Sequence, residues 1–402
     1  MKILMLTPYL PYPPASGGQI RTYNLLRHLS SAHEITLVCL YKKIEERQYA
    51  QHLKDYCKDI YLCKRPEKPW QISTVLKSVF GLLPFLVVRN YSQEAADKVE
   101  ELLKTESFDV LHAETFYVMP HIPKTHIPTL LVDQTLEYRV YKHYITQLPW
   151  YLHHPLRLDT FKLKFWEKHY WNHAQLVAAV SDSDAAMIHD LAPNINPVVI
   201  PNGASDDMFV MDPVKKDIKE SVKMLFVGNF SWLQNTEAVG FLIEQVMPLL
   251  SHDTIQYELT VAGQNIPSRL LQAKASNLHF VNLNEAGNEQ VRQVYTDAHV
   301  FVAPIFGPGG TRLKILTAMA TRLPVVTTAT GAEGLALQDG VSVLLAQSPQ
   351  EFAQKITHIA QDDVLRQALA HNAYTIARSQ FSWESITKKL VSSYESLVSS
   401  RN

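Results

Sequence analysis

The sequence predicts an α/β fold built from two doubly wound parallel sheets. Two series of short apolar segments alternate with helical patterns along the 402 residues, and the turn signal Pro201-Asn202-Gly203 separates the two series. Parallel strands are buried on both faces and therefore appear in a sequence as short, nearly continuous apolar runs. A chain of this length is also too long for one small core, so we expect two Rossmann-like domains.

The first series contains six predicted strands, at residues 2–7, 35–40, 59–63, 109–114, 128–133 and 176–181. The first loop carries Gly17 and Gly18 just before a helix that we expect to start near Gln19. This is not the Gly-x-Gly-x-x-Gly spacing of dinucleotide binding, which disfavours a nicotinamide-dependent oxidoreductase. Ligands of a doubly wound sheet bind at the carboxyl ends of the strands, so the loop is a wall of a ligand cleft or a plain glycine turn.

The second series contains six further predicted strands, at residues 223–229, 257–263, 278–281, 300–304, 324–330 and 342–346. A helical pattern follows near the end of the chain, at residues 381–397. We expect a first domain over residues 1–200, a second over residues 201–378, and a terminal helical segment over residues 379–402.

The segment 300–333 carries the most specific pattern in the chain. A predicted strand leads into a glycine-rich turn at residues 307–310, then a helix at about 312–322 and another strand. Glycine allows close approach of a ligand, and free N–H groups at a helix start attract an anion. Arg312 and Lys314 fall in the first turn, where the helix dipole favours acids, so their charge suggests an anionic partner outside the protein. The alternative is an ordinary turn with solvated basic residues.

The bulk composition is that of a globular protein. The chain is 46% hydrophobic and 19% charged, and its formal net charge of -1 gives no overall preference for nucleic acid or membrane. Cys39, Cys57 and Cys63 form a poor disulfide framework, which favours a reduced, cytoplasmic protein. The apolar start of the chain is short and is followed by prolines, as expected for a first strand and not for a membrane span.

One segment departs from this average composition. Residues 138–173 hold ten aromatic residues, six Lys or Arg, five His and two acids, Asp159 and Glu167. Basic and aromatic side chains together suit an anionic membrane surface. The alternative is a pair of helices whose aromatics pack in the core while their basic residues face solvent. RNA binding is a weaker third interpretation, because no nucleic-acid module accompanies the segment.

The order of residues after the glycine-rich turn resembles a known family. Ala318-Met319-Ala320, then Leu323-Pro324-Val325-Val326 and Gly331-Ala332-Glu333-Gly334, resemble the donor-site segment of the GT-B glycosyltransferases, specifically the retaining enzymes of family 4. Many members carry two glutamates separated by seven residues, and Gly309 and Thr317 stand at those positions here. The resemblance implies two domains facing across a cleft, with the terminal helix crossing back to the first domain.

The resemblance also implies roles for two residues at the end of the strand 109–114. This segment resembles the family's Asp-Val-x-His-x-His, whose second histidine is a candidate for catalysis or donor contact. His112 and Glu114 occupy the two histidine positions. A carboxylate at 114 can accept a proton or hydrogen-bond a sugar hydroxyl, whereas a structural histidine is the alternative for His112.

The donor site is implied in the same way. Family members often place an Arg and a Lys after the first strand of the second domain, but here Gly228-Asn229 is followed by Phe230-Ser231-Trp232. Arg312 and Lys314 are then the expected partners of the donor diphosphate. The other predicted donor-binding residues are Gly17, Gly18, Gly228, Asn229, Gly309, Gly310, Thr311 and Thr317.

The function implied is transfer of a hexose, with retention, from a nucleoside-diphosphate sugar to a hydroxyl of a glycan or lipid-linked acceptor. Neither a metal nor a further cofactor is expected. The resemblance points to cell-surface polysaccharide or glycolipid synthesis in the cytoplasm, with peripheral attachment to the inner face of the membrane as an option. The alternatives are a nucleotide-sugar epimerase of the same fold and a catalytically silent nucleotide-sugar-binding protein.

Overall fold

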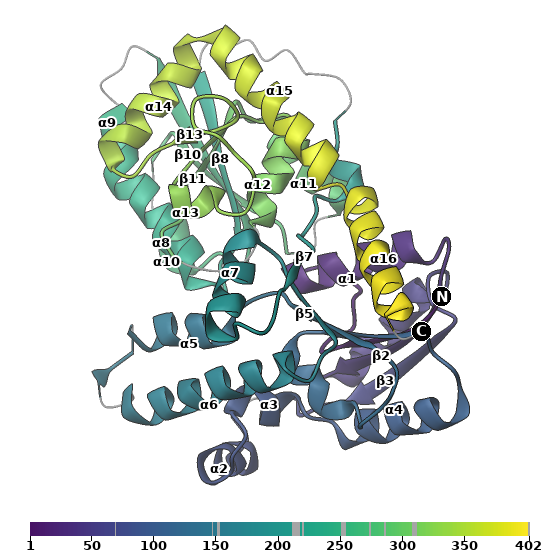
Figure 1. Cartoon of the computed structure of the whole chain (residues 1–402). Coiled ribbons are helices and arrows are strands. Elements are labelled where there is room, and N and C mark those ends of the chain that lie inside the picture. The colour runs from purple at the N-terminus through teal and green to yellow at the C-terminus, as the bar shows by residue number, and fades with distance from the viewer. Residues whose placement is uncertain are drawn as a thin grey trace. The chain divides into compact units, whose positions relative to one another are not determined.

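A computed structural model describes residues 1–68, 70–146, 148–150, 153–210, 218, 221–250, 255–272, 275–284, 287–307 and 312–400. The chain divides into two compact units. Unit 1 comprises Met1–Asn202 and Ile386–Asn402, and unit 2 comprises Gly203–Ser385 (Figure 1). No helix in the described part of the chain is both long enough and apolar enough to span a bilayer.

Unit 1 is built on a seven-stranded parallel sheet with the order β3-β2-β1-β4-β5-β6-β7. Its strands are β1 (Lys2–Thr7), β2 (Glu34–Tyr41), β3 (Asp59–Lys64), β4 (Val110–Glu114), β5 (Thr129–Asp133), β6 (Leu176–Ala179) and β7 (Val198–Val199). The predicted first series is therefore confirmed, and the two-residue β7 is added to it. The strand order reverses between β1 and β4, and such a switch point is where doubly wound sheets bind ligands.

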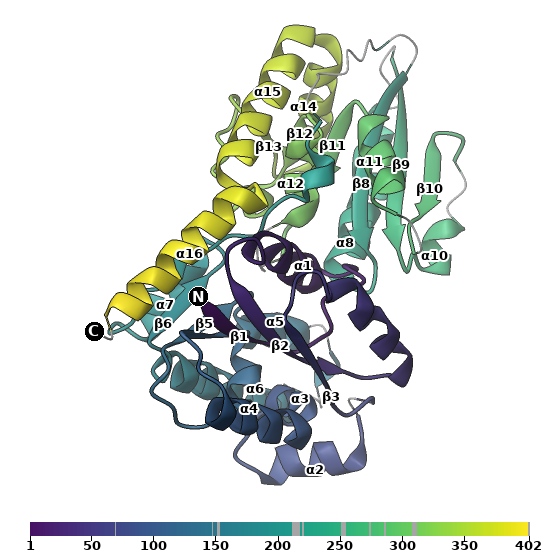
Figure 2. The same cartoon turned by 90° about the vertical axis from the view of Figure 1, so that its right-hand side faces the viewer.

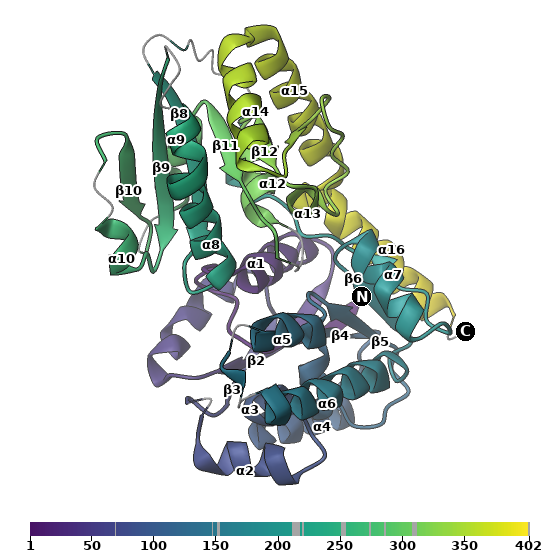
Figure 3. The same cartoon turned by 90° about the vertical axis from the view of Figure 1, so that its left-hand side faces the viewer.

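The helices of unit 1 are α1 (Gly17–Leu29), α2 (Ile72–Phe80), α3 (Phe85–Asn90), α4 (Gln93–Thr105), α5 (Glu137–Thr146), α6 (His153–Trp171) and α7 (Asp182–Leu191). The terminal helix α16 (Trp383–Ser399) contributes most of its length to this unit. The core joins alternate residues of the strands, such as Leu4 and Leu6 of β1, to Val99 and Leu102 of α4. Figure 3 shows α5 and α6 running side by side, and the two helices pack against each other.

Unit 2 is built on a six-stranded parallel sheet with the order β10-β9-β8-β11-β12-β13 (Figure 2). Its strands are β8 (Ser221–Asn229), β9 (Gln256–Gln264), β10 (Leu278–Asn282), β11 (Val300–Ala303), β12 (Val325–Thr327) and β13 (Leu344–Leu345). Its helices are α8 (Leu233–Phe241), α9 (Met247–Leu250), α10 (Ser268–Leu271), α11 (Asn288–Thr296), α12 (Leu313–Ala320), α13 (Ala329–Ala332), α14 (Pro349–Gln361) and α15 (Asp363–Gln380). The predicted second series is confirmed.

The sheet of unit 2 is buried on both faces. Met224 and Phe226 of β8 belong to a core cluster that includes α14, whereas Leu225 between them belongs to a second cluster that includes α12 and α15. Successive side chains of a strand point to opposite faces, so one apolar run supplies both cores. This explains why the strands of unit 2 appear in the sequence without a polar alternation.

Two helices begin within two residues of their expected starts, and the exact positions change how the predicted site residues are placed. Helix α1 starts at Gly17, because the side chain of Ser16 caps it by accepting a hydrogen bond from the backbone N–H of Gln19 (3.4 Å). Gly17 and Gly18 are thus the first two helical residues and not a turn before the helix. Helix α12 starts at Leu313 with Arg312 as its N-cap residue, so only Lys314 of the basic pair lies in the first turn.

Candidate functional site

A polar cluster occupies the carboxyl end of β4 in unit 1. Glu114 is the last residue of β4, and its side chain and that of His112 are both fully buried. The Glu114 Oε1 atom lies 3.0 Å from His112 Nε2 and accepts a hydrogen bond from Arg21 Nε at 3.3 Å. Gln134, just after β5, donates to the other carboxylate oxygen. The structure therefore brings the two predicted catalytic residues together, within one buried network.

The charge state of Glu114 follows from this network. Burial acts to raise the pKa of the carboxyl, but the Arg21 charge and the contact with His112 outweigh it and lower the pKa to about 2. Glu114 is therefore a carboxylate near neutral pH. A carboxylate can only accept hydrogen bonds, which excludes Glu114 as a proton donor in this arrangement.

Arg21 is the residue of this cluster that sequence reasoning missed. It lies on α1, is fully buried, and donates through Nη1 to the carbonyl groups of Ile200 (3.0 Å) and Pro201 (2.9 Å) and to Asn202 Oδ1 (3.0 Å). One arginine thus ties α1 to the end of β4 and to the turn motif that closes the first part of unit 1. A signal was present in the sequence, because Arg21 stands four and eight residues before Leu25 and Leu29 on the buried stripe of α1.

The terminal helix reaches the same cluster. The hydroxyl of Tyr394, on α16, is hydrogen-bonded to His112 Nδ1. Burial raises the pKa of Tyr394, so the hydroxyl stays protonated and can donate to Nδ1. His112 Nε2 then carries the proton that faces the Glu114 carboxylate, because a carboxylate can only accept.

Replacing Tyr394 by phenylalanine should lower the free energy of unfolding of unit 1 by about 1–3 kcal/mol, because His112 Nδ1 would be left buried without its partner. Urea denaturation followed by circular dichroism measures the change. Tyr91→Phe is the matched control, since it removes a hydroxyl that is bonded to Gln93 at the surface (3.1 Å). Equal effects of the two substitutions would show that the contact between α16 and His112 does not stabilise the unit.

The first turn of α1 packs against this network. A Cβ atom added to Gly18 would lie 2.2 Å from the Tyr9 hydroxyl oxygen and 2.9 Å from Gln134 Oε1. Gln134 Nε2 in turn donates to the Tyr9 hydroxyl at 3.0 Å. The close approach that requires glycine at position 18 is therefore made, in unit 1, to the protein itself. Gly18 thus lies against the network that contains Glu114, and the predicted contact of Gly17 and Gly18 with the donor stays a prediction.

The aromatic and basic segment 138–173 divides between two environments. Trp171 is fully buried and its indole N–H donates to Asp133, the last residue of β5. Glu167 is also fully buried, and it accepts hydrogen bonds from the backbone N–H groups of Glu137 (2.7 Å) and Tyr138 (3.3 Å) at the start of α5. These contacts confirm a pair of helices packed through part of its aromatic side chains. Other large apolar side chains of the segment are exposed, namely Tyr144, Trp150, Leu158, Phe161 and Phe165.

In unit 2, the predicted donor residues meet at the carboxyl end of β8. Asn235, on α8, donates through Nδ2 to the carbonyl group of Asn229 (2.6 Å), and Lys314 Nζ donates to Asn235 Oδ1. The Lys314 ammonium also lies 4.7 Å from the centre of the Phe226 ring. Asn235, which sequence reasoning did not select, is thus the buried link between Gly228-Asn229 and Lys314.

The protein environment disfavours the charged form of Lys314. Burial, and then the like charge of Arg312, lower the pKa of the Lys314 ammonium to about 7. Its hydrogen-bond acceptor, Asn235, is a neutral amide. An anion bound beside Lys314 would raise this pKa and would gain most from the ammonium at or below neutral pH.

Side-chain amides extend the site across the neighbouring strand ends. Asn229 Nδ2 donates to Gln264 Oε1 (3.1 Å), and Asn265 Nδ2 donates to Asn229 Oδ1 (3.2 Å). The backbone N–H of Asn265 donates to Asn284 Oδ1 at 2.9 Å. The ends of β8, β9 and β10 therefore carry a continuous set of neutral hydrogen-bonding groups. A Cβ atom at Gly263 would lie 1.8 Å from the carbonyl oxygen of Gly228, so glycine is required where β8 and β9 approach.

The remaining predicted donor residues have different surroundings. Arg312 is buried, and its Nη2 donates to the carbonyl group of Gly307 at 2.6 Å. The hydroxyl of Thr317 donates to the Leu313 carbonyl of its own helix at 2.9 Å. Gly309, Gly310 and Thr311 lie outside the described residues. Within the described ranges, no group of three or more His, Cys, Asp or Glu side chains is placed to hold a metal ion.

Comparisons with known proteins agree with this arrangement. Residues 15–207 match the family model described as Glycosyltransferase Family 4, and residues 221–362 match the model described as Glycosyl transferases group 1. An uncharacterised 44.6 kDa protein in the cps region of Klebsiella pneumoniae is 23% identical over 409 residues, which cover 98% of each chain.

Solved structures share the fold over the whole chain. Sucrose-phosphate synthase from Thermosynechococcus elongatus aligns with a TM-score of 0.75 at 16% identity and covers all of both chains. HepE of Anabaena, solved in complex with UDP and glucose, aligns with a TM-score of 0.67 at 14% identity over 98% of this chain and 100% of HepE. At these identities the likeness supports the two-sheet fold and leaves the substrates to the chemistry of the site.

Proposed function

The chain belongs to the GT-B glycosyltransferases, and from this premise we propose that it transfers a hexose, with retention, from a nucleoside-diphosphate sugar to a hydroxyl of a glycan or lipid-linked acceptor. The observation that carries the donor assignment is the position of Lys314. Its ammonium lies at the carboxyl end of β8 beside Asn235, and the charged neighbour that shifts its pKa is another cation, Arg312. An anionic ligand at this position would supply a countercharge to Lys314.

The proposed chemistry follows from where charge grows. Negative charge accumulates on the diphosphate as its bond to the sugar breaks, so a cation at that position stabilises the transition state more than the bound donor. Lys314 and Arg312 would serve this role together with N–H groups at the start of α12. The amides of Asn229, Gln264 and Asn265 would hydrogen-bond the neutral parts of the donor. Neither a metal nor a further cofactor has a place in this scheme.

In unit 1, His112 and Glu114 are proposed to act on the acceptor side. Glu114, as a carboxylate, would accept a hydrogen bond or a proton from an acceptor hydroxyl. Because both side chains are fully buried, this contact requires Gln134, which donates to the second carboxylate oxygen of Glu114, to move aside. The donor-side proposal does not depend on that movement.

The proposed setting is the synthesis of a cell-surface polysaccharide or glycolipid. The relative in the cps region of Klebsiella supports this, since it matches over 98% of both chains. We place the reaction in the cytoplasm, with segment 138–173 against the anionic inner face of the membrane. Six Lys or Arg against two acids in that segment supply the attraction.

The function is tested by turnover. The protein is incubated with each of a panel of nucleoside-diphosphate sugars, with and without an acceptor extract, and released nucleoside diphosphate is measured. We expect release only with the acceptor, and a product whose anomeric configuration by NMR is that of the donor. Conversion of the donor sugar without acceptor would instead show an epimerase. A thermal shift with a donor but no turnover would show a silent binding protein, which the neutral Thr317 at the family's usual glutamate position favours as second candidate.

A further inference from the structure

Helix α2 of unit 1 exposes its apolar residues and buries polar ones, which is the reverse of an ordinary surface helix. Ile72, Leu76, Val79 and Phe80 recur at i, i+4, i+7 and i+8, which places them on one side of the helix. That side faces outward, with exposures from 49% for Leu76 to 84% for Phe80. The buried side is made of Thr74 and Ser78 instead. An isolated helix in water gains nothing from such an arrangement, so the apolar side indicates a partner.

Helix α6 holds α2 in this orientation through polar contacts. Asp159 accepts hydrogen bonds from the Ser78 hydroxyl (3.1 Å) and from the Phe85 backbone N–H (2.9 Å). Lys162 Nζ donates to the carbonyl groups of Ser78 (2.7 Å) and Gly81 (2.8 Å). These bonds attach Ser78, on the buried side of α2, and the segment that follows the helix to α6, and the apolar side of α2 is left facing away from these contacts.

A second apolar stripe lies on α6 itself. Trp166 Nε1 donates to the Leu82 carbonyl at 3.0 Å, so positions 159, 162 and 166 of α6 face the segment of α2. Leu158, Phe161 and Phe165 precede these positions by one residue, which is about 100° around the helix. Their side chains are exposed by 58% to 72%. The two stripes therefore flank one polar seam.

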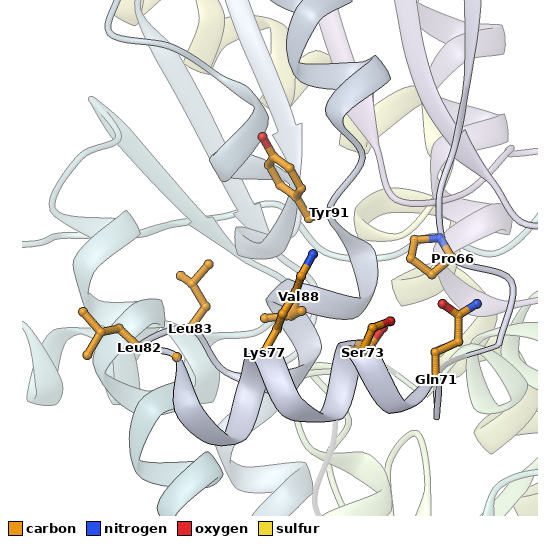
Figure 4. Close-up of a pocket in the computed structure, with 10 residues that line it drawn as sticks. Pro66, Gln71, Ser73, Lys77, Leu82, Leu83, Val88 and Tyr91 are labelled. Carbon is orange, nitrogen blue, oxygen red and sulfur yellow. The ribbon is translucent and has the colours of Figure 1, made fainter.

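A pocket beside α2 is also lined by polar residues of this helix. It has a volume of about 470 Å³ and lies between α2 and the segment that follows it, lined among others by Ser73, Lys77, Leu83 and Tyr91. Figure 4 shows Lys77 extending from α2 towards Tyr91. Thr74 and Ser78 of α2 thus face the protein, whereas Lys77 lines this pocket and is also exposed to solvent. All three overall views show α2 at the outer edge of unit 1, away from its strands.

The charges around this surface are mostly positive. Lys77 of α2 and Arg157, Lys164 and Lys168 of α6 are exposed. The two acids of α6 are bound within the protein, Asp159 by α2 and Glu167 by the start of α5. An apolar face bordered by basic side chains fits the boundary between the phosphates and the acyl chains of an anionic lipid bilayer. A protein partner would match the apolar stripes but gives no reason for the basic border.

We propose that α2, with Trp70 and Leu82 at its ends and the exposed stripe of α6 beside it, inserts into the interface of an anionic lipid bilayer. The apolar side chains enter the acyl region while Lys77, Arg157, Lys164 and Lys168 contact the phosphates. This rests on the proposed membrane attachment and deepens it, because the main contact moves from the charges of segment 138–173 to a helix outside that segment.

Vesicle flotation tests the proposal with three variants of the full chain. The first is Leu76→Ser, Val79→Ser, Phe80→Ser, and the second is Arg157→Gln, Lys164→Gln, Lys168→Gln. The control is Val364→Ser, which changes an apolar side chain on unit 2 that is 80% exposed. Vesicles are phosphatidylcholine with and without phosphatidylglycerol, at low and high salt. We expect the first variant to lose binding by about tenfold or more at both salt concentrations. The second should lose only the salt-sensitive part, and the control should match the parent.

Fluorescence gives an independent measurement. Trp70 is 70% exposed in the protein, so brominated acyl chains should quench the parent more strongly than Trp70→Phe. Circular dichroism melts confirm that the variants are folded.

Three outcomes would overturn the inference, and each says something different about the membrane. Flotation of the α2 variant equal to that of the parent would leave attachment to the charges of segment 138–173. A parent that floats with none of the vesicles would remove both membrane proposals, whereas the donor assay would still test glycosyl transfer. Self-association of the parent in sedimentation, lost in the α2 variant and without lipid binding, would assign this face to a second copy of the chain.

Discussion

Replacing Glu114 by alanine should destabilise unit 1 by about 3–5 kcal/mol, because it leaves the fully buried Arg21 without its countercharge. Nearly all other hydrogen bonds of Arg21 go to neutral oxygens of residues 200–202, which cannot replace a carboxylate. The change in urea midpoint, followed by circular dichroism, measures the loss. A shift below 1 kcal/mol would mean that the Arg21–Glu114 pair is weakly coupled to folding.

Two comparisons isolate the effect of burial. Glu100→Ala removes the surface partner of Lys104 and should cost less than about 1 kcal/mol, because solvent screens that pair. The double substitution Arg21→Met with Glu114→Gln should cost less than the sum of the two single substitutions, since each single substitution leaves a buried charge unpaired and the double variant leaves none.

The same pair predicts a pH dependence. The pKa of Glu114 falls from an ordinary value of 4.5 to about 2 in the folded protein. The folded state therefore binds fewer protons than the unfolded state, and the stability contributed by Glu114 is present above pH 4.5 and is lost as the pH falls towards 2. The unfolding free energy of Glu114→Ala should vary less with pH across this window than that of the parent.

The second large effect is expected on donor binding. Replacing both Arg312 and Lys314 by alanine should weaken binding of a nucleoside diphosphate by tenfold or more for each cation, because a charge-assisted hydrogen bond contributes roughly 1.5–3 kcal/mol. Titration calorimetry measures the affinity, and the kcat/KM for donor should fall further. Lys223→Ala is the matched control, since Lys223 is exposed near the opposite end of β8.

The pKa of Lys314 adds a test that the control cannot mimic. Because this pKa is about 7 without ligand, affinity of the parent for the diphosphate should fall as the pH rises through 7. Lys314→Ala should remove that dependence, and a nucleoside without phosphates should bind all variants alike. Unchanged diphosphate affinity in a folded double variant would make the pair a structural helix start, and the phosphate site would have to be sought at Gly17 and Gly18.

The fold was accessible from the sequence because its strands are buried on both faces. Runs such as Val300–Ala303 are apolar throughout, and a run of that kind marks a strand wherever it falls. The exact start of α1 was less accessible, since glycines are expected in a turn and only the cap of Ser16 makes them helical. Strand β7 was not predicted, because two residues are too few to show a periodic pattern.

The site residues could be predicted from the sequence only where residues close in the sequence act together. Lys314 and Arg312 could be selected because both follow one glycine-rich turn. Arg21, Tyr394 and Asn235 were not selected, because each meets its partner across 79 to 282 residues of chain. Of the three, Arg21 alone carried the local signal described above, its place on the apolar stripe of α1. The outward apolar side of α2 was equally invisible, since its spacing matches that of a helix packed in a core and only the burial of Thr74 and Ser78 shows which side faces in.

The contact between Tyr394 and His112 has a consequence for biosynthesis. Unit 2 is one continuous stretch, whereas unit 1 is assembled from two stretches separated by the whole of unit 2. The ribosome synthesises all of unit 2 before the last residues of unit 1. Tyr394 is therefore made 282 residues after His112, which is more than half the chain later. The strand ends of unit 1 are then without α16 during that interval, and a premature stop after unit 2 would damage the part of the protein made first.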